Sequence, residues 1–227
     1  MELKMSKKGL IALGAMVALG QALHAQTCIG SASFLSGPAR IGAGVSISDN
    51  VKSYGLDLAV GAPAGAFGSA TVARAEYDGI DGGGTVLGAS AGYAIDATPA
   101  KTMQFCPQVG YEYQSGPDVD SGFGTISTSA HDFSLGGSFG GRVAASPTFD
   151  FVPFASAAYV IARAGETFNG TSSSVSEDFV QIGVGAGFVI GRTLTLQPLV
   201  SFPVGLEGGK SIFQIAFALN FGSSPTP

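Results

Sequence analysis

The sequence is poor in charge, in cysteine and in tryptophan. Charged residues make up 12% of the 227 residues, two residues are cysteine, and tryptophan is absent. Apolar residues reach 45%, so the low charge does not indicate disorder. With a formal net charge of −5 the chain is acidic, which argues against nucleic acid as a partner.

A long apolar run is also missing after the first two dozen residues. No later stretch approaches the roughly 18 continuous apolar residues that a membrane-spanning helix needs. If this chain enters a membrane, it must do so as a closed barrel, because in lipid only helices and closed barrels satisfy all their backbone hydrogen bonds.

The N-terminal sequence has the organisation of a secretory signal peptide. Three lysines, the first of them Lys4, precede an apolar run that is too short to span a bilayer, and small residues follow. We expect cleavage after Ala22 or Ala25. The chain is then divided into a cleaved signal peptide (1–25), a periplasmic N-terminal segment (26–38), a β-barrel (39–221) and a C-terminal tail (222–227).

Alternation of large apolar residues with small or polar ones dominates the rest of the chain. From Phe213 to Phe221 every second residue is large and apolar, which is typical of a β-strand with one apolar face. In the third such segment we expect Arg74 and Glu76 to point inward, which turns Tyr77 outward. Ten segments are predicted to be strands: 39–47, 53–61, 69–77, 85–96, 102–114, 132–143, 149–162, 178–190, 193–204 and 213–221.

The connections between these segments fall into two groups by length. Short ones, such as 191–192, lie on one side of the predicted sheet, and the two longest, 115–130 and 164–177, lie on the other. Transmembrane barrels have short periplasmic turns and longer outer loops, whereas a sandwich has no reason to segregate its loops. We predict an all-β fold, a transmembrane antiparallel up-and-down β-barrel of ten strands, with eight as the alternative.

At this point the chain resembles the small outer-membrane β-barrel proteins of diderm bacteria, the OmpA-like, OmpX-like and porin-like barrels. The closing stretch "FQIAFALNF" resembles the C-terminal assembly signal of that family, although "GSSPTP" follows it here. The resemblance implies an outer-membrane location, contact with outer-membrane lipid, and periplasmic chaperones and the barrel-assembly machinery as partners during biogenesis. We expect a monomer. The apolar residues of the signal are Phe213, Ile215, Phe217, Leu219 and Phe221.

Cys28 and Cys106 are the only cysteines. An even number in an oxidising compartment suggests one disulfide. Such a bond would draw the N-terminal segment across the lumen, and we hypothesise that residues 26–38 form a tethered periplasmic plug. Two unpaired thiols or an intermolecular bond are the alternatives.

Charged residues on the alternate phase of the strands are predicted to face the lumen. Charges of both signs in a narrow barrel either pair as a structural lattice or line a narrow aqueous path, and Gly183, Gly185 and Gly187 would widen such a path. The predicted lumen-facing charges are Arg40, Asp57, Arg74, Glu76, Glu112, Asp132 and Arg142.

Three functions remain open from the sequence. The first is a porin-like passive channel for ions or small solutes, and the second is a closed structural or surface-interaction barrel. The third is an enzyme at the outer rim, but His131 and Asp132 are neighbours on a strand and point to opposite faces. We therefore expect no enzyme, no catalytic residue, no cofactor and no metal site.

Overall fold

The computed structural model describes residues 39–62, 64–80, 82–100, 102–120, 124–191 and 193–221. The predicted signal peptide, the N-terminal segment with Cys28 and the C-terminal tail lie outside these residues. Three short strands are β5 (Ile95–Asp96), β7 (Val119–Asp120) and β9 (Val143–Ser146). The ten long strands are β1 (Ala39–Ser48), β2 (Val51–Gly61), β3 (Ala66–Tyr77), β4 (Gly83–Tyr93), β6 (Met103–Ser115), β8 (Thr125–Gly141), β10 (Phe149–Phe168), β11 (Thr171–Ile190), β12 (Leu194–Val204) and β13 (Ile212–Phe221).

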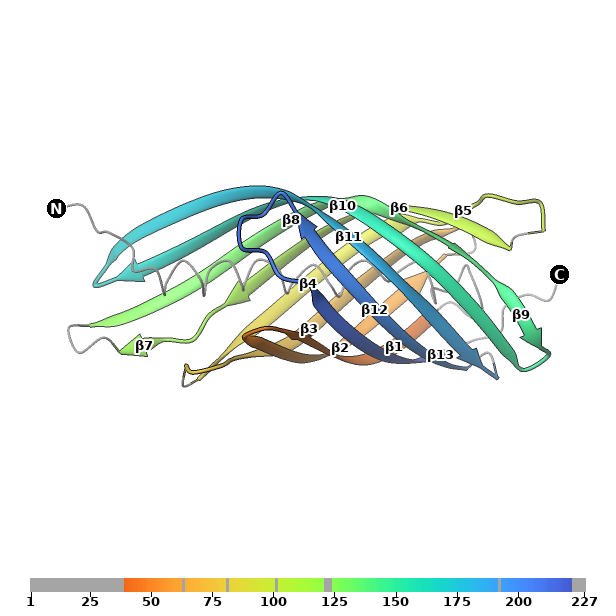
Figure 1. Ribbon diagram of the computed structural model, residues 1–227, viewed down its shortest axis with the longest axis horizontal. Helices are drawn as coiled ribbons and strands as arrows, with labels where there is room; N and C mark the ends of the chain where they lie inside the picture. The colour runs from red at the N-terminus through yellow and green to blue at the C-terminus, as the bar shows by residue number, and fades with distance from the viewer. Residues whose placement is uncertain are drawn as a thin grey trace.

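The long strands form one closed sheet (Figure 1). Each pairs antiparallel with the next along the chain, and β13 pairs with β1 in a register that places Ala39 opposite Phe221 and Ile47 opposite Phe213. The predicted ten-stranded antiparallel β-barrel is confirmed, and the eight-stranded alternative is wrong.

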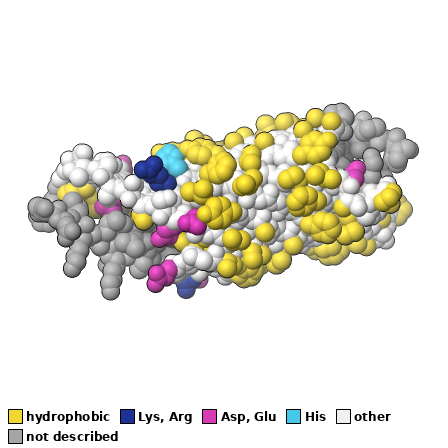
Figure 2. Space-filling view, turned by 90° about the horizontal axis from the view of Figure 1, so that it is seen from above, with side chains coloured by type: hydrophobic (Ala, Val, Ile, Leu, Met, Phe, Trp, Pro, Cys, Tyr) yellow, Lys and Arg dark blue, Asp and Glu magenta, His cyan; other side chains and the backbone are white. Residues whose placement is uncertain are grey.

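Successive side chains point alternately to the outside and to the interior. In β13, Phe213, Phe217 and Phe221 are exposed, whereas Gln214 and Ala218 are buried. The same alternation on the other strands covers the outside with apolar side chains (Figure 2). A continuous apolar belt of this kind suits the hydrocarbon of a bilayer. Among the described residues no helix is long and apolar enough to span a membrane.

Strand β3 has the opposite phase from the one predicted. Ala75 and Tyr77 are buried in the interior, and Arg74 and Glu76 are exposed on the outer face. The prediction assumed that charge must avoid the outside of a barrel. Both residues lie near the end of β3, however, where charged side chains can reach the water beyond the lipid.

Strands β8, β10 and β11 extend past their neighbours at one end of the barrel (Figure 1). We call this the outer end, because transmembrane barrels carry their longer loops outside. The predicted outer loop 164–177 is wrong: β10 and β11 continue to a two-residue turn at Asn169 and Gly170, whose φ angles are 48° and 80°. Positive φ at both positions is typical of a type I′ hairpin turn.

Large inward side chains lie over glycines of neighbouring strands. A Cβ added at Gly185 would lie 2.6 Å from the Cζ of Phe154, and one at Gly183 would lie 3.3 Å from Cδ1 of Leu199. Phe67 lies over Gly92 in the same way. The glycines of β11 therefore make room for side chains of β10 and β12, and the space above Gly183 and Gly185 is occupied rather than open.

We expect Gly185→Ala to lower the free energy of unfolding by about 1–3 kcal/mol, because the new Cβ would displace Phe154 and press on the carbonyl of Pro198. Urea unfolding of the refolded protein in phospholipid vesicles measures the change. Gly68→Ala is the matched control, since its Cβ would meet only the Ser90 carbonyl oxygen, at 3.5 Å. Equal stability of the Gly185→Ala protein and the wild type would contradict this packing.

Candidate functional site in the barrel interior

The interior of the barrel contains a polar zone to which every long strand contributes. Many amide and hydroxyl side chains lie there, and most of them are buried from solvent. Such a density of buried polar groups differs from the apolar core of a soluble protein. The buried amides are Gln104, Gln108, Gln114, Gln181, Gln197, Gln214 and Asn220.

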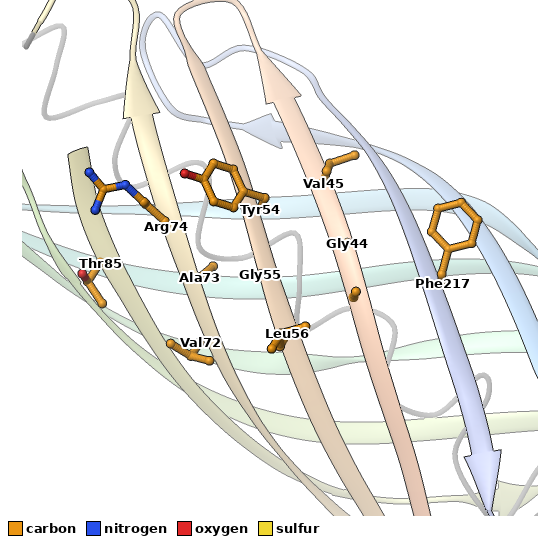
Figure 3. A pocket seen from close by; sticks show the side chains of 11 residues that line it. Gly44, Val45, Tyr54, Gly55, Leu56, Val72, Ala73, Arg74, Thr85 and Phe217 are labelled. Atoms are coloured by element: carbon orange, nitrogen blue, oxygen red, sulfur yellow. The ribbon is translucent and has the colours of Figure 1, made fainter. Parts of the chain in front are cut away.

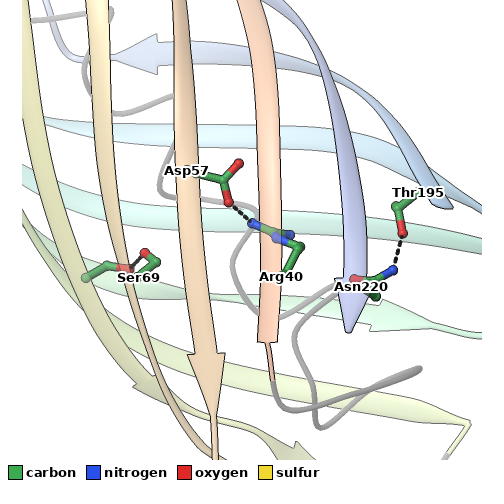
Figure 4. Close-up of polar contacts among 6 residues, drawn as sticks. Arg40, Asp57, Ser69, Thr195 and Asn220 are labelled. Atoms are coloured by element: carbon green, nitrogen blue, oxygen red, sulfur yellow. Dashed lines mark hydrogen bonds and ion pairs between the residues drawn. The ribbon is translucent and has the colours of Figure 1, made fainter. Parts of the chain in front are cut away.

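An ion pair joins β1 and β2 inside the barrel (Figure 4). Nη2 of Arg40 donates a hydrogen bond to Oδ2 of Asp57 at 2.8 Å. The register places Asp57 opposite Gly42 rather than opposite Arg40. A Cβ at Gly42 would overlap the Asp57 carboxylate, so the missing side chain leaves the space through which Arg40 reaches its partner.

Hydrogen bonds between neutral side chains join further pairs of neighbouring strands on the inner face of the barrel. Because each bond connects neighbouring strands, it fixes their register as well as satisfying two buried groups. The pairs are Ser46 with Ser53 at 2.7 Å, Ser69 with Ser90 at 2.7 Å, and Asn220 with Thr195 at 3.0 Å.

Two carboxylates lie side by side in the polar zone. Glu112 of β6 and Asp132 of β8 are register partners, and their exposed fractions are 1% and 3%. Side chains directly opposite each other on antiparallel strands have Cβ atoms roughly 4.5–5.5 Å apart. The two carboxyl groups therefore lie on one wall of the interior.

An apolar cluster lies toward the outer end of the interior, where Gln114 and Asp132 are the register partners of its members Ala130 and Ala162. Val51 begins β2, Tyr77 ends β3 and Ile212 begins β13, and all three belong to this cluster. Phe179 joins from β11, and Leu206 joins from the loop between β12 and β13. The cluster, which we call the outer apolar cluster, also includes Ala73, Ala75, Val86, Ala130, Val160, Ala162 and Ala164.

Two buried amides of the polar zone have atoms without a hydrogen-bond partner. In the part of the chain that the structure describes, these atoms are the amide nitrogen and oxygen of Gln181 and Nε2 of Gln197. An unsatisfied buried amide costs about 1–3 kcal/mol, a cost that a hydrogen bond to water would remove.

The predicted lumen-facing charges separate into three groups. Arg40 and Asp57 pair inside the barrel, and Glu112 and Asp132 are buried there. Arg142, which continues the inward phase of β8 at the inner end, pairs with the buried Asp150, its Nε lying 3.0 Å from Oδ1. For Arg74 and Glu76 the prediction is wrong, because both lie on the outer face.

Cys106 is buried at the inner end of the barrel, in a small cluster with Phe67 and Ala94. Its predicted partner Cys28 lies outside the described residues. The disulfide and the tethered plug therefore stay predictions.

Three tyrosines on the outer face form hydrogen bonds with polar side chains of the next strand. The Tyr54 hydroxyl donates to Glu76 at 2.9 Å, and the Tyr159 hydroxyl donates to Asp178 at 2.8 Å. The third, Tyr111, shares a hydrogen bond of 2.7 Å with Nδ1 of His131. Each bond joins a strand to the next one near the outer end, where amphipathic rings suit the interface between lipid and water.

Comparison with known proteins shows the fold and no closer relationship. No family model and no curated protein matches the sequence. The translocator domain of the autotransporter NalP from Neisseria meningitidis is similar with 12% identity and a TM-score of 0.57, over 93% of this chain and 99% of that one. The β domain of the Bordetella autotransporter BrkA is similar with 14% identity and a TM-score of 0.53, over 82% and 100%.

We expect Arg40→Met to lower the free energy of unfolding by about 2 kcal/mol, because Asp57 would keep a charge in the interior without its partner. The double variant Arg40→Met/Asp57→Asn should recover part of this loss. The control is Lys52→Met, whose partner Asp78 lies 3.9 Å away with both side chains 61% exposed, and there we expect less than about 1 kcal/mol. Urea unfolding in vesicles compares the three. A loss at Lys52 as large as at Arg40 would contradict the account.

Proposed function

We propose that this chain, which has the fold of outer-membrane β-barrels, is a surface-interaction barrel in the outer membrane of a diderm bacterium. In this proposal the barrel anchors the protein in lipid, and the extended ends of β8, β10 and β11 contact partners outside the cell.

The projecting ends of these strands carry the proposal. From Thr171 to Asp178 every side chain of β11 is exposed, and most are serine or another small polar residue. This part of β11 pairs with β10 on one side, whereas its other neighbour, β12, ends at Val204 opposite Val180. In the described residues the second edge of 171–179 is therefore unpaired. An open strand edge offers backbone N–H and C=O groups to an extended peptide.

The outer apolar cluster supports this function over that of an open pore. Its members come from seven of the long strands and from the loop between β12 and β13, and they include Phe179 and Leu206. Water and ions pass an apolar constriction poorly, because a narrow apolar segment dewets. An aqueous path at this level would run beside these apolar side chains and beside Gln114, which donates a hydrogen bond to Tyr77.

A narrow passive channel for ions or small solutes is the second candidate, and the polar zone favours it. Gln181, Gln197 and the Arg40–Asp57 pair provide polar walls over much of the interior.

Planar-bilayer conductance of the refolded mature chain, residues 26–227, separates the two candidates. We expect no discrete current steps from the wild type. The double variant Phe179→Ser/Leu206→Ser removes two large side chains of the outer apolar cluster and should increase the probability of steps. Regular steps from the wild type, with folding verified by heat-modifiable gel mobility, would favour the channel instead.

The open edge is tested by panning a random peptide library against the protein in lipid nanodiscs. We expect enriched peptides with the alternation of a β-strand. The control joins Ala164 to Val175 by an Asn-Gly turn, a shortening that the register permits because these partners are four positions from Phe168 and Thr171 and so form the same type of pair. Peptides that bind the shortened protein as well as the wild type, or no enrichment at all, would overturn the proposed surface.

A further inference from the structure

The outer face of the barrel contains a groove over β13, β1, β2, β3 and β4 (Figure 3). Its volume is about 560 Å³. The register explains its position: Ala43 lies between Phe217 on β13 and Leu56 on β2, so one small side chain is flanked by two large ones. Val45 and Val72 continue the walls. The depression thus follows from the outward-facing residues alone.

The groove lies in the apolar belt and runs toward a row of polar side chains near the outer end. Tyr54, Arg74 and Thr85 are register partners on β2, β3 and β4, and all three line the groove. Its walls therefore suit a hydrocarbon chain, and one end offers a cation and the Thr85 hydroxyl, because the Tyr54 hydroxyl already donates to Glu76. This combination matches an amphipathic molecule with an anionic head.

Arg74 is a cation without an acidic partner among the described residues. Two lysines at the same end do have acidic partners. Nζ of Lys52 lies 3.9 Å from Oδ1 of Asp78, and Nζ of Lys210 lies 3.2 Å from Oδ2 of Asp49. Glu76, the acidic residue nearest in sequence, instead accepts the Tyr54 hydrogen bond. An exposed arginine at the lipid–water interface can bind a phosphate with two parallel hydrogen bonds.

The absence of a side chain at Gly83 leaves room for the guanidinium of Arg74 near that interface. A Cβ added at Gly83 would lie 3.1 Å from Nη2 of Arg74, so the arginine lies over Gly83 on the next strand. Gly83 begins β4 at the outer end. The charged group is thereby directed toward the level of lipid headgroups rather than toward the middle of the belt.

We propose that this groove binds one phosphorylated acyl lipid, with an acyl chain along Ala43 and the phosphate on Arg74. A bilayer lipid without phosphate would find the same apolar walls but no ionic contact. A free phosphate would contact Arg74 but would make no apolar contact with the walls of the groove.

Native mass spectrometry of the refolded protein, titrated with dioleoyl phosphatidic acid, tests the proposal. We expect one retained lipid at low concentration, and about tenfold weaker retention of dioleoylglycerol, which lacks the phosphate, and of glycerol phosphate, which lacks the chains. Equal retention of dioleoylglycerol would overturn the ionic contact.

Two variants remove one half of the site each. Arg74→Gln removes the charge, and Ala43→Leu fills the groove with a side chain that lipid tolerates. Each should weaken retention of phosphatidic acid about tenfold. The matched controls are Arg163→Gln, an outward arginine at the same end that does not line the groove, and Ala157→Leu, a small outward residue on β10. Both controls should retain the lipid like the wild type.

Two outcomes would contradict the proposal. Equal loss in Arg163→Gln would mean that anionic lipid binds anywhere around the rim. A dimer mass that disappears in Ala43→Leu would mean that a second copy of the chain occupies the groove.

Discussion

The structure depends on the hydrogen-bonded seam between β1 and β13. In lipid each unpaired backbone group costs several kcal/mol, so a sheet that crosses a membrane must close. The register from Ala39 opposite Phe221 to Ile47 opposite Phe213 closes it. Once the sheet is closed, period-two alternation assigns every side chain to lipid or to the interior. The apolar belt, the polar zone and the groove at Ala43 all follow from that assignment.

The interior is compatible with closure because glycine and large side chains occupy facing positions. Phe154 lies over Gly185, Phe67 over Gly92, and Asp57 uses the space above Gly42. A barrel rich in glycine is thus filled from neighbouring strands rather than left wide. The polar zone adds hydrogen bonds that hold the register of the strands, and the outer apolar cluster fills part of the outer end with large side chains. The contacts in the interior join neighbouring strands to one another. We therefore place the function on the projecting strands.

The sequence predicted the barrel and most strands because alternation is strong wherever one face meets lipid. It failed where lipid no longer imposes that pattern. Near the outer end Arg74 and Glu76 can reach water, so their charge did not reveal the face of β3. Beyond the belt both faces of β10 and β11 are wet, and only Asn169-Gly170, a hairpin signal, could have revealed the strands. The Arg40–Asp57 contact is diagonal, and no pattern predicts it before the register is known.

The most direct test of the account is a distance across the seam. Spin labels at Ile41 and Leu219, which are register partners on β1 and β13 and face lipid, report it in the refolded protein by electron paramagnetic resonance. The account predicts strong dipolar broadening, because side chains opposite each other start from Cβ atoms roughly 5 Å apart. Spectra that equal the sum of the two singly labelled proteins would show that β1 and β13 do not pair, and would contradict the closed barrel.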